Sequence, residues 1–128
     1  LARNSDFADS VSFPTAFVAG NDVVEGNPEM VNRVLAALRE AIDYRSTNTD
    51  EAIALTADFL NLSVDQVAAD AANVQILSLA ELDGFTEDGT VNRWLSGMVD
   101  YFIEAGRLDA PADPADFYTG DLFVGAGN

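Results

Sequence analysis

Four segments of the sequence carry the residues that start an α-helix, and this repeated pattern limits what the chain can fold into. Asn27-Pro28-Glu29 is the clearest of them. Asn accepts hydrogen bonds from free backbone N–H groups, Pro fits the first helical position, and Glu favours the positive end of the helix dipole. The other three place Glu or Gln three residues after a short polar residue, as in Asn48 with Glu51, Ser63 with Gln66, and Ser78 with Glu81. The chain is therefore expected to be mostly helical.

The spacing of apolar residues predicts two long helices with three short ones between them. The first long helix runs from Pro28 to about Arg45, and the second from about Thr90 to Ala105, where Gly106 provides the stop. In both, apolar side chains recur every three or four residues and form one stripe. Trp94 lies on the stripe of the second long helix, so we expect it to pack in the core. The three short helices follow the remaining capped starts, and the last of them is expected to be a single turn.

A short apolar block near the start of the chain predicts a β-strand. The block begins at Phe13 and is closed by Gly20-Asn21-Asp22, a pattern typical of a buried strand followed by a turn. Pro14 has no N–H to donate and fits only the first residue or the edge of a strand, so we expect the strand over Pro14–Ala19. Val74–Leu77 is a second candidate for extended structure. A lone strand needs a partner, which must be a segment outside these 128 residues or a second copy of the chain.

The composition excludes several classes of function. The chain has 22 Asp plus Glu, six basic residues that are all Arg, and no His, Cys or Lys, so its formal net charge is −16. It lacks the usual general base, the thiolate nucleophile and the soft metal ligands, and we expect neither an enzyme nor a cofactor. The negative charge disfavours nucleic acids and anionic membrane surfaces as partners. No uncharged run approaches the roughly 20 residues that span a bilayer.

The acidic segment around Asp83 superficially resembles a calcium-binding loop. The spacing argues against a calcium site: with Gly89 at loop position six, Gly84 falls at position one and Leu95 at position twelve, where the ion needs carboxylates. We therefore expect a solvated turn and no metal ligands. The many other acidic side chains are expected to solvate helix faces and to cap helix N-termini.

The order of these features resembles the C-terminal portion of periplasmic solute-binding proteins of the nitrate, sulfonate and taurine type, which deliver substrates to ABC importers. Proteins that bind thiamine precursors are related to this group. The resemblance runs from about Phe13 to Phe123. The features that carry it are Asn27-Pro28-Glu29, the helix opening with Asp50-Glu51-Ala52, the short helix opening at Ser63, the Trp94 helix ending in Gly106-Arg107-Leu108, and Asp113-Pro114-Ala115-Asp116-Phe117.

The resemblance implies a fold and an arrangement of domains. The fold would be an α/β periplasmic-binding-protein-like (type II) lobe fragment, mostly helical, with one or two short strands. Residues 1–128 would be the C-terminal part of one incomplete lobe, and residues 1–12 would cross between the two lobes. The expected strand would then join a sheet built mainly from upstream residues. Substrate would be bound in the cleft when the two lobes close around it.

The resemblance also implies partners, a location and weak site residues. The protein would capture a small solute outside the cytoplasmic membrane and deliver it to the transmembrane subunits of an ABC permease. It would be periplasmic or extracytoplasmic, with room for a lipid anchor in a region upstream. Most solute contacts would come from segments that this chain lacks. Phe13 and Thr15, just after the crossing segment, are the candidate ligand-binding residues, although a hydrophobic plug is the other role open to them.

Three alternatives stay open. The charge of −16 disfavours anionic solutes unless upstream residues offset it, so a neutral or cationic solute is also open. The chain could instead be a stand-alone acidic helical module that binds a partner protein. A pyrimidine-synthase-like enzyme on the same fold is the third reading, and the absence of His disfavours it.

Overall fold

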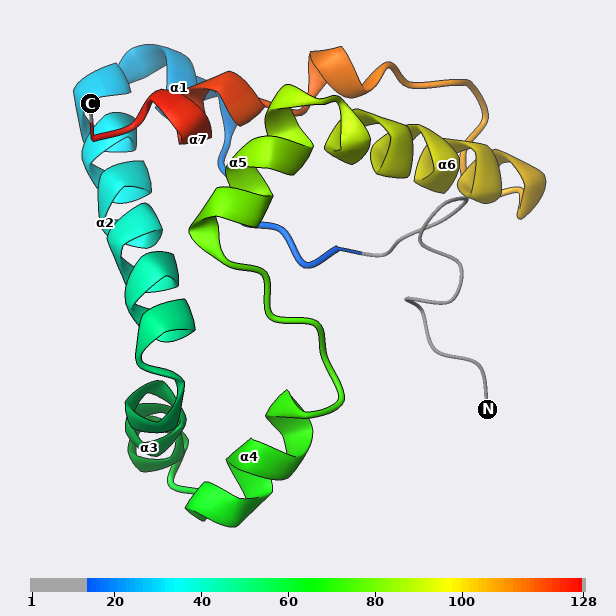
Figure 1. Ribbon diagram of the computed structural model, residues 1–128. Helices are drawn as coiled ribbons and strands as arrows, with labels where there is room; N and C mark the ends of the chain where they lie inside the picture. Colours follow the sequence, from blue (N-terminus) through cyan, green and yellow to red (C-terminus); the bar gives the residue numbers. More distant parts are fainter. Residues whose placement is uncertain (1–13, 128) are drawn as a thin grey trace.

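Residues 14–127 are the part of the chain that the computed structural model describes, and they are mostly helical (Figure 1). The α-helices are α1 (Asn21–Gly26), α2 (Pro28–Thr47), α3 (Thr49–Leu60), α4 (Val64–Ala71), α5 (Leu79–Glu87), α6 (Thr90–Glu104) and α7 (Gly120–Gly125). A 3-10 helix, η2 (Pro114–Asp116), precedes α7.

The expected α/β fold with one or two strands is wrong for residues 14–127, because none of them forms a β-strand. The segment from Pro14 to Gly20 is irregular and exposed and belongs to no strand ladder. Gly20 does not close a strand with a turn but starts α1, since its carbonyl accepts hydrogen bonds from the amides of Val23 (3.0 Å) and Val24 (3.1 Å). Residues 75–78 are irregular as well. An apolar run forms a strand only when a neighbouring strand satisfies its backbone, and residues 14–127 supply none.

Most of the helix N-caps predicted from the sequence are confirmed. Ser63 and Ser78 each form a capping box with the residue three positions later, and Asn27 accepts a hydrogen bond from the amide of Met30 at 3.2 Å. The capping box predicted at Asn48 is wrong, because the Asn48 amide group donates to the carbonyl of Tyr44 (3.1 Å) instead. Helix α5 has 9 residues and is longer than the predicted single turn.

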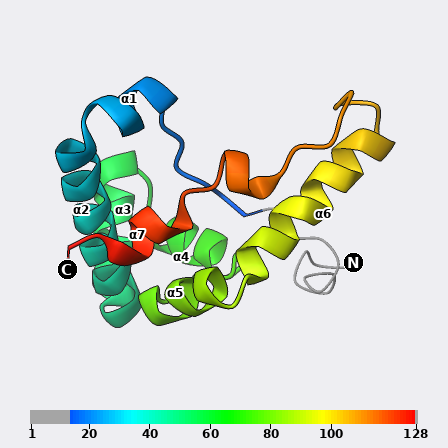
Figure 2. The same cartoon turned by 90° about the horizontal axis from the view of Figure 1, so that it is seen from above.

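Helix α2 organises the described part of the chain. Helices α1, α5 and α7 pack against it, and α3 packs against it near its C-terminal end. Helices α3 and α4 form an arm: α4 contacts only α3, and α3 contacts only α2 and α4, among the elements of residues 14–127. Helix α6 leads away from α5 on the side opposite α2, with η2 packed against it (Figure 2).

Few side chains are enclosed by this arrangement. The buried apolar side chains of the described chain are Ala57, Val67, Val99, Pro114 and Ala126, and no large side chain in it is fully buried. Trp94 is half-buried rather than central, and its ring meets that of Phe85 edge-on at 5.3 Å between centroids. Phe17 and Phe59 are 80% and 87% exposed. The apolar stripes predicted from the sequence are thus present, but much of their surface has no cover within residues 14–127.

The total exposed area leads to the same conclusion. The accessible surface is 9448 Å², whereas a compact monomer of 13.6 kDa exposes roughly 6,600 Å². Residues 1–13 and 128 could account for at most roughly 2,100 Å², the area of a fully extended stretch of that length. The accessible surface left for residues 14–127 still exceeds the roughly 6,000 Å² that a compact domain of their size exposes.

Candidate functional site

The two residues nominated from the sequence are not brought together into a site that the structure describes. Thr15 lies in the irregular segment before α1 and is exposed. Phe13 lies outside the described residues, as does the expected crossing segment over residues 1–12. Their nomination as ligand-binding residues therefore stays a prediction.

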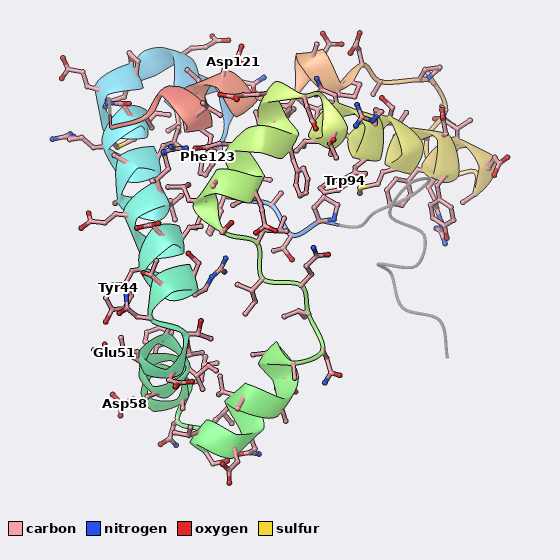
Figure 3. All side chains as sticks on the ribbon, viewed as in Figure 1. Tyr44, Glu51, Asp58, Trp94, Asp121 and Phe123 are labelled. Carbon is pink, nitrogen blue, oxygen red and sulfur yellow. The ribbon has the colours of Figure 1, made fainter. Side chains whose placement is uncertain are left out.

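The most closely connected polar group joins α2, α5 and α7. Nη1 and Nη2 of Arg39 donate to the two carboxylate oxygens of Asp83 at 2.6 Å and 2.9 Å. The guanidinium carbon lies 5.0 Å from the ring centre of Phe123, which α7 supplies (Figure 3). Hydrogen bonding to Asp83 raises the pKa of Arg39, and partial burial offsets the rise in part. Because both terminal nitrogens of Arg39 donate to Asp83 and the guanidinium lies over the Phe123 ring, the pair acts as a structural clamp between α2, α5 and α7.

A second junction fixes the start of α7. The hydroxyl groups of Thr86 on α5 and Tyr118 are hydrogen-bonded at 2.9 Å. Gly120 is buried beside them, and a Cβ there would lie 2.7 Å from Thr86 Cγ2 and from the Tyr118 ring. Glycine is therefore required for this close approach. This junction, like the clamp, is structural.

An open groove lies between α2 and α3, and we call it the α2–α3 groove. Its volume is about 500 Å³, within the range of small-molecule sites, but such sites normally enclose most of their ligand and this groove is open along its length. It is lined by Ala37, Glu40, Ala41, Tyr44, Arg45, Ala52, Leu55 and Thr56. An open, mostly apolar groove suits an elongated partner better than a small solute.

Two acidic side chains of α3, Glu51 and Asp58, lie near the α2–α3 groove but are not part of its lining (Figure 3). Tyr44, Glu51 and Asp58 follow the same edge of the molecule from α2 to α3 (Figure 3). The Tyr44 hydroxyl donates to the Glu51 carboxylate, and this hydrogen bond raises the pKa of Tyr44. Arg45, also in the lining, donates to the carbonyl of Leu77 at 3.3 Å. The lining itself thus carries one acidic side chain, Glu40, and one basic side chain, Arg45.

Neither a second hollow nor a metal-binding cluster adds a candidate site within residues 14–127. A smaller hollow of about 80 Å³ between α1, α2 and α7 is mostly apolar, and Leu122 closes one side of it. Residues 14–127 contain no cluster of three or more Asp or Glu placed to hold a metal ion. Within the same residues, no helix combines the length and the apolar character that crossing a bilayer requires.

The comparisons with known proteins point to a binding role for the proteins that this chain resembles. Relatives from Brucella abortus, Brucella suis and Brucella melitensis are each described as a "putative binding protein". Each is 44% identical to this chain over 124 residues, which cover 97% of the chain and 39% of the relative. The chain thus spans about two fifths of the length of the curated relatives it matches. No family model and no solved structure matches the chain.

The α2–α3 groove was not anticipated from the sequence, although part of its signal is present there. Ala37 and Ala41 are four residues apart on one helix, and Leu55 and Phe59 are four apart on the next. Each pair shares a helix face, which the sequence indicates. That the two faces meet in a groove depends on how α3 turns back against α2, and no local pattern specifies that angle.

Proposed function

We propose that this chain is part of the substrate-binding component of an ABC importer, which captures a small solute outside the cytoplasmic membrane and delivers it to the permease. The observation that carries the proposal is the 44% identity along 97% of the chain to proteins described as binding proteins. The ordered resemblance to the nitrate, sulfonate and taurine group supports the finer assignment. The protein would be periplasmic or extracytoplasmic and would carry out no covalent chemistry.

The exposed apolar surface supports the proposal that this chain packs against further parts of a larger protein. Phe17 and Val18 are 80% and 93% exposed, and they are adjacent in the irregular segment before α1. Burying a large apolar side chain stabilises a protein by about 1.5–3 kcal/mol, so leaving many of them in water is costly. In this proposal the remaining three fifths of the protein cover these residues.

The solute contacts would lie mainly in that remaining part. The α2–α3 groove is too open to enclose a small solute, and both terminal nitrogens of Arg39 already donate to Asp83. Thr15 is available to contribute because it is exposed at the start of the described chain. The charge of −16 favours a neutral or cationic solute unless basic residues elsewhere offset it.

A thermal-shift screen of the intact protein tests this proposal. The panel would contain nitrate, taurine, an alkanesulfonate and a thiamine precursor, each at several concentrations. A true ligand present at about 100 times its Kd stabilises the folded state by about 2.7 kcal/mol, which gives a concentration-dependent rise in Tm. No rise with any member would count against the solute class, and equally tight binding by residues 1–128 alone would contradict the proposed location of the contacts.

A further inference from the structure

We propose that the α2–α3 groove docks an amphipathic helix of a partner protein, one that carries an apolar stripe flanked by Arg or Lys. Three observations carry the proposal: the small residues that line the groove, the exposed apolar stripe beside it, and the acidic side chains of α3 near it. The proposal goes beyond the solute-binding function and does not depend on which solute is bound.

The lining of the groove suits a helix. Ala37, Ala41 and Ala52 line it, and such small side chains allow a second helix to approach closely. Tyr44 and Leu55 are the larger apolar groups of the lining. A helix presents side chains every three or four residues along one face, which is how amphipathic helices occupy hydrophobic grooves.

The apolar lining continues beyond the groove along α3. Leu55 is 57% exposed and Phe59 is 87% exposed, and their spacing of four residues places them on one face of the helix. The exposure of both side chains shows that no element of residues 14–127 covers this face. Exposed aromatic and aliphatic side chains at such spacing are typical anchors for a docked helix.

The charges identify the chemistry of the partner. Helices α3 and α4 carry acidic residues at Asp50, Glu51, Asp58, Asp65 and Asp70, and the sequence has no Arg or Lys between Arg45 and Arg93. Glu51 and Asp58 are four and three residues from Leu55, so they flank the apolar stripe. A second copy of the chain would bring another formal charge of −16, which disfavours self-association. A partner helix with an apolar stripe and flanking Arg or Lys complements both the exposed apolar face of α3 and these acidic side chains.

Two synthetic peptides of about 18 residues, or five helical turns, test the proposal on the intact protein. Both carry Leu along one face; one has Arg at the flanking positions and the other has Glu. Titration calorimetry at low salt is expected to show the Arg peptide binding at least about tenfold more tightly than the Glu peptide. The difference should shrink at about 1 M salt, where charges on the surface are screened.

Variants test whether the Arg peptide binds at the groove and the exposed face of α3 beside it. Phe59→Ser is expected to weaken binding of the Arg peptide about tenfold or more, and Val74→Ser, which also alters an exposed apolar residue but lies outside α3, should change it less than about twofold. Asp58→Asn removes one charge from an exposed position without removing packing, so it keeps the test valid if Phe59→Ser fails to fold. It should weaken binding of the Arg peptide and reduce its salt dependence.

Several outcomes would overturn the proposal. They are no binding of either peptide, equal binding of both, or unchanged binding by Phe59→Ser and Asp58→Asn. A dimer that Phe59→Ser dissociates would make a second copy the occupant. If Phe59 is protected from hydroxyl-radical labelling in the intact protein without any added peptide, the rest of the same polypeptide covers this face of α3. None of these results bears on the solute screen, so the two proposals fail separately.

Discussion

The clamp between Arg39 and Asp83 gives the sharpest prediction about stability. Arg39→Met removes two charge-assisted hydrogen bonds and the contact with Phe123 while keeping most of the apolar stem. It also leaves the Asp83 carboxylate without its partner on α2. Helices α2, α5 and α7 should therefore be held together less tightly.

The magnitude follows from the exposure of the pair. The side chains of Arg39 and Asp83 are 15% and 25% exposed. Exposed ion pairs contribute about 0.2–1 kcal/mol, and breaking a fully buried pair costs about 3–5 kcal/mol. This pair lies between those limits, and the cation–π contact with Phe123 adds about 0.5–1 kcal/mol. We expect Arg39→Met to cost about 2–3 kcal/mol and Asp83→Asn about 1–2 kcal/mol, because Asn keeps one acceptor for the guanidinium.

Native-state hydrogen exchange of α2 and α5 amides in the intact protein measures these changes as free energies of local opening. A double-mutant cycle with both changes should give a coupling energy of about 1–2 kcal/mol. Arg33→Met is the matched control, since Arg33 is exposed on the same helix, and it should cost less than about 0.5 kcal/mol. A coupling energy near zero, or equal costs for Arg39→Met and Arg33→Met, would refute the clamp.

Three further predictions concern individual residues. Gly120→Ala should lower the free energy of unfolding by about 1–3 kcal/mol in thermal melts because of its 2.7 Å contacts, whereas Gly125→Ala, with nothing within 4 Å, should not. Ser63→Ala should cost about 1 kcal/mol in urea unfolding, since it removes a helix cap; an unchanged urea midpoint would argue against that cap. The Ser78 hydroxyl lowers the pKa of Glu81 below its ordinary 4.5. The stabilisation that this hydrogen bond gives the folded protein is therefore present above pH 4.5, and it is lost as the pH falls through the lowered pKa of Glu81 in the folded state. Melts of Glu81→Gln between about pH 6 and pH 3 should lack that loss, and profiles parallel to the parent protein would contradict it.

The parts of the fold that depend on neighbouring residues could be predicted from the sequence. Capping boxes at Ser63 and Ser78 form as predicted, because cap and partner are three residues apart on one turn. The predicted helix from Pro28 is confirmed and continues to Thr47. Helix α1 was not anticipated, because its start at Gly20 has no side-chain cap and its first residues, Asn21 and Asp22, were predicted to form a turn.

The parts that depend on distant residues could not be predicted. The strand over Pro14–Ala19 is wrong because a strand is defined by its partner, and an apolar run carries no information on whether one exists. The pairing of Arg39 with Asp83 joins residues 44 positions apart, and the α2–α3 groove depends on the packing angle of two helices. Thr15 was nominated for its place beside a strand, and without that strand its role as a ligand-binding residue stays a prediction.

The central claim is that the rest of a larger binding protein covers the apolar surface around Phe17 that residues 14–127 leave open. Hydroxyl-radical footprinting of the intact protein and of residues 1–128 alone tests it directly, because labelling reports the exposure of each aromatic side chain. We predict that Phe17, 80% exposed here, is labelled at least about tenfold more slowly in the intact protein, because burial there shields its ring. Phe59, which faces the proposed partner, should be labelled equally in both. Equal labelling of Phe17 in the two proteins would contradict the claim.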